Sequence, residues 1–344
     1  MLILPYSTAL RLNQIPYVTF TIMVLCLVIF FFQIQNRNVI NNTAQLYCEL
    51  IKNTEPEDHT YDVIPQDNEY CLTILLSMHS LRDVKEWRSY FLEYYTADND
   101  LEKYITYDLK HYSEFVAKGV PADLDTKLMY YPFSFNPFKM LTSALSHTDW
   151  EHIIFNLIFF FAFTPAIEIL VGNKLKFIGV LVSIELIGGI MYSILSLINN
   201  SPIPTLGLSG SVMGMIGFSA YMMPKASIRT VFWFSFYIRK LFIPVWVLAI
   251  WFIGWDIFDL FIRTEDGGGT NFVAHVSGGI SGYLIARFFF KDRRDLVQDE
   301  LDDEIDRSRA SRQDTFARMT SFIGDRKRID EELQGYQTKK DQAV

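Results

Sequence analysis

The chain has 344 residues, of which half are hydrophobic and 20% are charged, and its formal net charge is −8. Such an apolar chain is not an ordinary soluble domain, and its large charged fraction fits only if apolar and charged residues are segregated along the sequence. They are segregated here, so the negative charge describes the solvated segments and gives no support for a nucleic-acid partner.

Long apolar stretches recur along the chain, and a membrane-spanning helix needs about 20 mostly apolar residues. Six stretches meet this requirement: Tyr17–Gln33, Ile153–Val171, Leu175–Ile198, Leu208–Met223, Leu241–Ile262 and Phe272–Phe290. The first could be a signal peptide, but it lacks a small-residue cleavage site and polar residues follow it, so we treat it as a retained anchor. We therefore expect an all-α membrane protein with six transmembrane helices.

Lysine and arginine concentrate in the short loops on one side of the predicted bundle. They follow segments two, four and six: Lys174, Lys176, Lys225, Arg229, Arg239, Lys240, Lys291, Arg293 and Arg294. The positive-inside rule then places both termini in the cytoplasm. Residues 1–16 form a cytosolic N-terminus, residues 17–33 the first transmembrane helix, and residues 292–344 a charged cytosolic tail.

Residues 34–148 form a long first external loop that could fold as a small external domain. Helical spacing of apolar residues within Leu81–Lys118 predicts one or two amphipathic helices there, at Leu81, Val84, Trp87, Tyr90, Phe91 and Tyr94. Such helices could cap the outer surface or recruit a substrate. Cys48 and Cys71 both lie in this loop, and an oxidising compartment would allow a disulfide between them.

The second segment opens with His147-x4-His152-x3-Asn156. His152 and Asn156 share one helix face, and both can donate a hydrogen bond to a developing oxyanion. A plain polar helix start is one alternative. A zinc site is another, although no carboxylate or cysteine cluster completes it. We expect neither a metal nor a cofactor.

The fourth segment opens with Gly207-Leu208-Ser209-Gly210. Glycines on both sides of the serine permit a sharp turn and a close approach by a reacting carbonyl. The start of a helix also offers unpaired backbone N–H groups to an oxyanion. The alternative is a small-residue packing motif, continued by Gly214 and Gly217.

The fifth segment is rich in large aromatic residues. Trp251, Trp255 and Phe258 could form a substrate gate, or they could belong to an interfacial aromatic belt. Asp256 and Asp259 lie near its outer end, where we expect contact with water or with the Gly267–Gly269 loop.

The sixth segment opens with Ala274-His275-Val276-Ser277-Gly278, followed by Gly282. A neutral imidazole is suited to take a proton from Ser209 and to return it. Gly278 and Gly282 form a small face that could pack on the glycines of the fourth segment, which would bring His275 and Ser209 to one depth. A structural histidine is the alternative reading.

In order and spacing these motifs resemble the rhomboid family over about Phe138–Phe290. The resemblance implies a rhomboid-like bundle with its catalytic core at residues 149–291, with Ser209 as nucleophile and His275 as base. It also implies an oxyanion hole formed by His152, Asn156 and Ser209. His147, Gly207 and Gly210 match supporting positions, as do Gly278 and Gly282, and Glu168 and Gly172 match the acidic residue and the glycine at the inner end of the second core helix.

Two positions depart from the family pattern. Phe138-Lys139 stands where many members have Trp-Arg, and Trp87-Arg88 lies too far upstream to replace that pair. Met213 stands where some members stack a tyrosine on the histidine. No Asp lies in a motif position to orient His275, so we expect a catalytic dyad.

The predicted function is intramembrane serine endopeptidase activity on transmembrane protein substrates, with the lipid bilayer as the surrounding medium. The expected location is a bacterial inner membrane, with the active site open to the outer face. An inactive relative that binds client helices, a small-solute transporter and a membrane metalloenzyme are the alternatives. The natural substrate, the oligomeric state and the roles of the external loop and tail cannot be predicted from the sequence.

Overall fold

The computed structural model describes residues 2–8, 14–54, 68–80, 101–200, 203–234, 237–262, 271–295 and 314. It divides into two units, Met1–Phe289 and Phe290–Val344, and the first holds every helix and strand named below. The predicted amphipathic residues from Leu81 to Tyr94, the Gly267–Gly269 loop and most of the predicted tail lie outside the described residues.

Helices dominate the first unit. The long helices are α1 (Tyr17–Thr54), α7 (Trp150–Val171), α8 (Lys174–Asn199), α9 (Ser209–Met222), α10 (Val245–Ile262) and α11 (Phe272–Phe289). The helices between α1 and α7 are α2 (Asn68–Ser80), α4 (Leu101–Ala117), α5 (Leu124–Leu128), the 3-10 helix η2 (Pro132–Ser134) and α6 (Pro137–Ser143).

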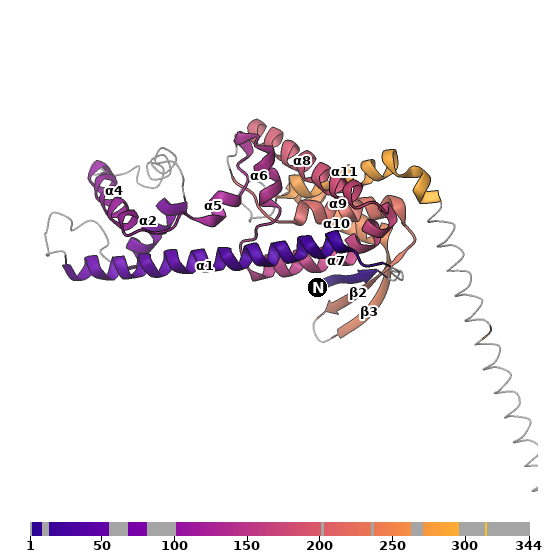
Figure 1. Cartoon of the computed structure of the whole chain (residues 1–344), viewed down its shortest axis with the longest axis horizontal. Helices are drawn as coiled ribbons and strands as arrows, with labels where there is room; N and C mark the ends of the chain where they lie inside the picture. Colours follow the sequence, from indigo (N-terminus) through magenta and orange to yellow (C-terminus); the bar gives the residue numbers. More distant parts are fainter. Residues whose placement is uncertain are drawn as a thin grey trace, which may run out of the picture. The chain divides into compact units, whose positions relative to one another are not determined.

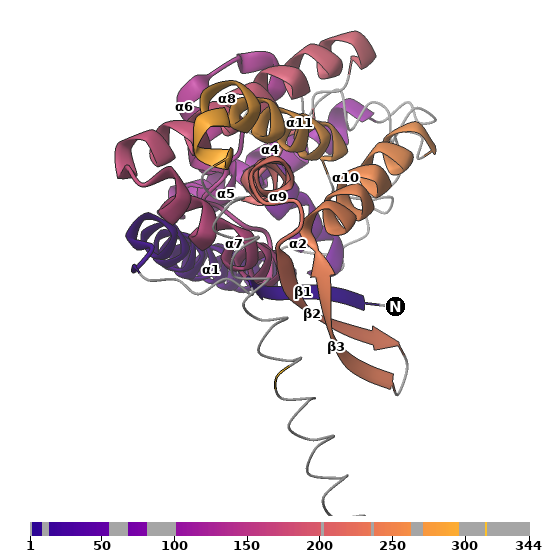
Figure 2. The same ribbon diagram turned by 90° about the vertical axis from the view of Figure 1, so that its right-hand side faces the viewer.

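Helix α9 lies at the centre of the bundle, with α7, α8, α10 and α11 around it (Figure 2). Nearly all of its residues are buried. Its glycines permit the close packing, because a Cβ at Gly214 would lie 2.5 Å from Cγ2 of Ile184 on α8. Small residues let helix backbones approach closely in a membrane, where packing rather than water exclusion drives association.

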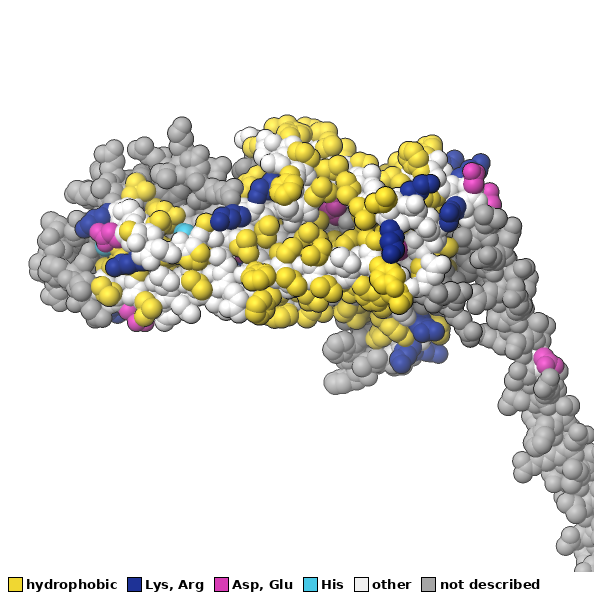
Figure 3. Space-filling model, viewed as in Figure 1, with side chains coloured by type: hydrophobic (Ala, Val, Ile, Leu, Met, Phe, Trp, Pro, Cys, Tyr) yellow, Lys and Arg dark blue, Asp and Glu magenta, His cyan; other side chains and the backbone are white. Residues whose placement is uncertain are grey.

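Four of the predicted membrane spans coincide with helices long and apolar enough to cross a bilayer: Tyr17–Lys52, Trp150–Val171, Lys174–Asn199 and Val245–Ile262. The other two predicted spans are helices α9 and α11, which do not meet that criterion. With 14 residues, α9 would extend about 21 Å, less than the roughly 30 Å hydrocarbon core. Hydrophobic side chains cover much of the bundle on the face shown in Figure 3. The chain is therefore membrane-embedded, while the count of six spans stays a prediction.

A three-stranded antiparallel sheet corrects the all-α prediction. Its strands are β1 (Leu2–Thr8), β2 (Ser227–Phe234) and β3 (Tyr237–Pro244), in the order β1-β2-β3. The predicted fifth span therefore starts at Val245 rather than Leu241. The sequence Ser227–Phe234 is rich in β-branched and aromatic residues, which favour strands. Its basic residues were interpreted as charges of a loop, so these strands were not predicted.

The inner end of α7 anchors the start of α1. The carboxylate of Glu168 accepts hydrogen bonds from the backbone N–H of Val18 and of Thr19, each at 2.8 Å. It thereby satisfies N–H groups that a helix start leaves unpaired. Gly172 ends α7 in a left-handed conformation (φ 67°), which glycine adopts without a steric penalty.

Helix α1 does not end at the predicted membrane boundary near Gln33 but continues to Thr54. Figure 1 shows α2 and α4 beside the C-terminal half of α1. The three helices share a small hydrophobic core: Ile40, Ala44, Tyr47, Cys48, Leu75 and Phe115. Cys48 of α1 and Cys71 of α2 form a disulfide with a Cα–Cα distance of 5.9 Å. We call these three helical segments the α1–α2–α4 module.

Candidate active site

Ser209 is the first residue of α9, and the turn before it depends on glycine. Gly207 has a φ of 118°, a backbone conformation that side chains disfavour. A Cβ at this position would lie 2.5 Å from Nε2 of His152 and 3.7 Å from Nδ2 of Asn156. Gly207 therefore lets the chain bring Ser209 beside the two predicted oxyanion donors.

His275 lies in the first turn of α11, which packs on α9 through glycines. A Cβ at Gly278 would lie 2.5 Å from the carbonyl oxygen of Gly210, and a Cβ at Gly282 would overlap that of Gly214. These contacts place the start of α11 next to the start of α9. The serine and the histidine thus occupy the same end of two helices in close contact.

Ser209 and His275 line one cavity of about 630 Å³. Its walls come from α7, α9, α10 and α11, with these lining residues: Phe155, Asn156, Phe159, Ser209, Val212, Met213, Trp251, Phe252, Trp255, Asp256 and His275. In the part of the chain that the structure describes, no hydrogen bond joins Ser209 to His275 directly. The cavity leaves both side chains open to a common guest.

Asn156 presents an unused hydrogen-bond donor to this region. Its side chain is buried, and its Nδ2 has no hydrogen-bond partner. An unpaired buried polar group costs about 1–3 kcal/mol. A bound oxyanion would satisfy this donor, which makes Asn156 a candidate for binding negative charge.

The N-terminal turn of α7 fixes His152. Asp149 caps the helix, since its Oδ1 accepts a hydrogen bond from the backbone N–H of His152 at 2.9 Å. Nδ1 of His152 lies 3.1 Å from the hydroxyl of Thr148. The other ring nitrogen, Nε2, points toward Gly207, where a built Cβ would lie 2.5 Å from it.

His147 is fully buried and packs its ring against that of His152, with centroids 5.1 Å apart. Burial, with the neighbouring His152 as a second cause, lowers the pKa of His147 to about 3. Its imidazole is therefore neutral at pH 7 and acts as a packing surface for His152.

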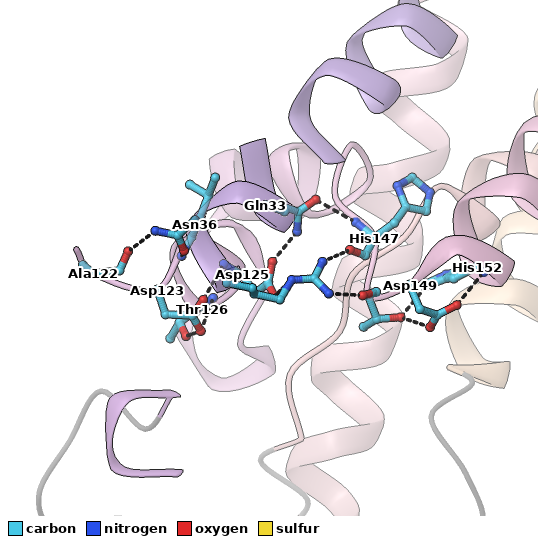
Figure 4. Close-up of polar contacts among 12 residues, drawn as sticks. Gln33, Asn36, Ala122, Asp123, Asp125, Thr126, His147, Asp149 and His152 are labelled. Carbon is cyan, nitrogen blue, oxygen red and sulfur yellow. Dashed lines mark hydrogen bonds and ion pairs between the residues drawn. The ribbon is translucent and has the colours of Figure 1, made fainter. Parts of the chain in front are cut away.

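Polar side chains of α1 hold the turn that carries these histidines (Figure 4). The backbone N–H of His147 donates to Oε1 of Gln33 at 3.2 Å. The Arg37 guanidinium donates to the carbonyl oxygens of His147, at 3.2 Å, and of Thr148, and its Nε lies 3.0 Å from a carboxylate oxygen of Asp125. Sequence reasoning did not find this support, because it depends on contacts between distant segments.

An acidic residue lies beside His275, although no motif position carries an Asp. Oδ2 of Asp256 on α10 lies 2.9 Å from Nδ1 of His275. The available signal was a carboxylate within an otherwise apolar span, since such residues are costly and usually functional. From the sequence, this carboxylate was expected to contact water or the Gly267–Gly269 loop instead.

The predicted gate residues lie on α10, in part along the cavity. Trp251 and Trp255 line the cavity and stack with centroids 5.8 Å apart. Phe258 packs on Trp255 but is not among the lining residues, and it is half exposed. Across the cavity, Phe252 of α10 meets Phe159 of α7 edge to face at 5.1 Å.

The described residues include no group of three or more His, Cys, Asp or Glu placed to hold a metal ion. A comparison with curated proteins found none that matches this chain. Comparison with family models matched residues 135–292 to the Rhomboid domain. This range contains α6 to α11, the cavity and every residue of the candidate site described above except Gln33, Arg37 and Asp125. The chain therefore contains a Rhomboid domain, the domain of a family that includes intramembrane serine proteases acting on membrane-protein substrates.

Proposed function

We propose that the protein is an intramembrane serine endopeptidase that cleaves peptide bonds in or near transmembrane segments of other membrane proteins. The observation that carries this proposal is the common cavity, which is lined by a serine at one helix start, a histidine at another and Asn156, whose amide donor is unpaired. The match to the Rhomboid domain supports the same reaction class.

In the proposed reaction the Ser209 hydroxyl attacks the carbonyl carbon of the scissile bond. His275 accepts the hydroxyl proton as general base and later donates it to the leaving amine. Hydrolysis of the acyl-enzyme by water then returns the free serine. The tetrahedral intermediate carries negative charge on the former carbonyl oxygen, so donors are needed at that point.

Three donors are available for this oxyanion. They are the backbone N–H of Ser209 at the start of α9, the Asn156 amide, and the imidazole of His152. Removing one such donor typically lowers kcat by about 10²–10³-fold. The unpaired state of the Asn156 amide favours this role, because an oxyanion would satisfy it in the transition state.

Hydrolysis also needs water beside Ser209. A second cavity of about 30 Å³ adjoins this residue and is lined by polar groups that include Glu185, Asn271 and Thr205. A site of roughly 10–15 Å³ can hold one water molecule. We propose that this cavity supplies the attacking water from the side opposite the substrate.

A transmembrane substrate must unwind before its peptide bonds can be cleaved, since a helix hides them in its own hydrogen bonds. Segments with glycine, proline or other small residues near their outer end are the expected substrates. We propose access between α7 and α10, where the rings of Phe159 and Phe252 are in contact and Trp251 and Trp255 form part of the cavity wall. These tryptophans then act as the gate rather than as an aromatic belt alone.

The proposed topology has six spans, with both termini in the cytoplasm and the cavity open to the outer face of a bacterial inner membrane. The sheet is consistent with this arrangement, because it pairs the N-terminal strand β1 with the basic hairpin of β2 and β3. The positive-inside rule predicts the cytoplasmic side for both segments.

The test uses the purified full-length protein in proteoliposomes and a labelled single-span substrate with small residues at its outer end. The wild-type protein should cleave it, and Ser209→Ala and His275→Ala should not. A fluorophosphonate should label the wild-type protein and not Ser209→Ala. Equal cleavage by Ser209→Ala would refute the assignment, and failure of all proteins to cleave or label would favour a non-catalytic family member that binds client helices.

A further inference from the structure

The contact between Asp256 and His275 joins two helices at the candidate site. Oδ2 of Asp256 lies 2.9 Å from Nδ1 of His275, and their side chains are only 15% and 14% exposed. Both residues line the cavity that also contains Ser209. The carboxylate therefore contacts the ring nitrogen that is not needed for proton transfer with the serine, if Nε2 faces Ser209.

The position of a carboxylate at Nδ1 has a chemical consequence for the imidazole. A neutral imidazole carries one N–H, and the hydrogen bond made by one nitrogen decides which nitrogen keeps the proton. A carboxylate can only accept, so Nδ1 of His275 must donate, which leaves the lone pair on Nε2. This tautomer is the one that can accept the proton of Ser209.

The same contact also places a carboxylate next to the imidazolium that forms during the reaction. A positive charge on His275 would lie in direct contact with the negative Asp256 carboxylate, in a site with little exposure to water. His152 of α7 is another titratable group that interacts electrostatically with His275. Because His152 adds no negative charge, Asp256 is the group that can offset the charge on His275.

A purely structural role for Asp256 explains fewer of these observations. Asp256 could tie α10 to α11 without any effect on chemistry. However, a carboxylate in an apolar span is costly, and a neutral amide would connect the helices at a lower desolvation cost. Asp259 occupies the same helix almost one turn later and is not among the residues that line the cavity. Of the two acids on α10, only Asp256 contacts the histidine in the described contacts.

We propose that Asp256 is a positioning residue that holds His275 in the orientation and tautomer required for proton transfer with Ser209. The proposal rests on the protease function proposed above and extends its pair of reacting residues by a third group from α10. It assigns the orientation of the base to a helix outside the two that carry the serine and the histidine.

The experiment compares Asp256→Asn, Asp256→Glu and the matched control Asp259→Asn in the full-length protein in proteoliposomes. The readouts are kcat and KM for the single-span substrate, the rate of fluorophosphonate labelling, and the thermal unfolding temperature. Loss of an orienting carboxylate lowers kcat by up to about 10⁴-fold in water-soluble serine proteases, and we expect a loss of roughly 10–100-fold for Asp256→Asn. KM should stay within about twofold, since the residue does not bind substrate.

Two further results separate positioning from a structural role. Asp256→Glu keeps the acceptor, so it should recover part of kcat, and Asp259→Asn should retain wild-type kcat. Nitrogen NMR of ¹⁵N-labelled histidine should show a single Nδ1–H tautomer for His275 in the wild type and a mixture in Asp256→Ala. If Asp256→Asn does not fold, the glutamate variant and the tautomer of His275 decide the question in its place.

The outcomes distinguish this proposal from the proposed function. If Ser209→Ala abolishes cleavage while Asp256→Asn keeps wild-type kcat, the positioning role is wrong and the protease assignment stands. A lower unfolding temperature and a higher KM, with kcat unchanged, would likewise overturn the positioning role and favour a purely structural contact between α10 and α11. If Ser209→Ala cleaves normally, the protease assignment itself fails.

Discussion

The glycine contact between α9 and α11 allows a prediction whose magnitude follows from the structure. A Cβ at Gly278 would lie 2.5 Å from the carbonyl oxygen of Gly210 and 3.2 Å from its carbonyl carbon. Carbon–oxygen contacts between packed helices are normally about 3.3 Å or longer, so Gly278→Ala requires a separation of roughly 0.8 Å. The opposing atom belongs to the backbone, so no side chain can rotate away to absorb the change.

This displacement acts directly on the candidate site. Gly210 follows Ser209 in the chain, and Gly278 lies one helical turn after His275. Overpacking of a dense interior costs about 1–3 kcal/mol. A misplacement of about 1 Å can lower an enzymatic rate by about 10²-fold. We therefore expect Gly278→Ala to lower kcat/KM for the single-span substrate by roughly 10–100-fold and to lower the unfolding temperature.

The assay measures cleavage and thermal unfolding in the same lipid preparation. Gly179→Ala on α8 is the matched control, because no atom lies within 4 Å of a Cβ built there. Alanine favours a helix over glycine by up to about 1 kcal/mol, so this variant should be as stable as the wild type or more stable. Wild-type cleavage by Gly278→Ala would refute the idea that this contact sets the distance between Ser209 and His275.

Three other predictions concern the segments outside the bundle. Arg37→Ala removes the donors that hold the carbonyls of the His147–Thr148 turn. We expect kcat to fall about tenfold and the free energy of unfolding to fall by roughly 1–3 kcal/mol. Arg37→Lys keeps the positive charge without the two parallel N–H donors of the guanidinium, so its kcat should be intermediate. Burial raises the pKa of Asp108 in α4 to about 7. The protonated carboxyl therefore favours the folded α1–α2–α4 module. Its contribution to stability is fully present below about pH 4 and is lost as the pH rises through about 7. Asp108→Asn should flatten this pH dependence in hydrogen-exchange measurements at pH 5 and 8. Cys48→Ser should make α2 more sensitive to limited proteolysis. The disulfide closes a loop with a sequence separation of 23 and contributes roughly 3 kcal/mol to stability. Unchanged proteolysis would show that the hydrophobic core alone holds the module.

The arrangement of the glycine helices was accessible from the sequence. Ser209 and His275 each open an apolar segment, and each segment carries small residues at a regular helical spacing. That spacing has few uses other than close helix packing, so the neighbouring position of α9 and α11 could be inferred. The short length of α9 was accessible as well, because the predicted segment Leu208–Met223 exceeds the helix by only one residue at each end.

The extent of α1 and the sheet show two limits of pattern reading. Hydropathy marks where a helix leaves the membrane, but the polar residues after Gln33 still favour a helix, so α1 continues to Thr54. In the segment Ser227–Pro244, basic residues supplied a topology signal while the alternate apolar residues supplied a strand signal. The partner strand β1 lies more than 200 residues away, and nothing local in the sequence indicates that pairing.

The departure from the family pattern at Met213 and the contact between Asp256 and His275 can be understood together. Met213 stands where some relatives place a tyrosine against the histidine, and it lines the cavity without a ring to stack on His275. Asp256 reaches the same histidine from α10 and restrains it by charge and hydrogen bonding instead. A stacked ring restrains only the plane of the imidazole, whereas a carboxylate also selects the tautomer. Because α10 also carries Trp251 and Trp255, a displacement of this helix during substrate access would move the acid as well as the gate. Orientation of the base and admission of the substrate would then depend on the same helix.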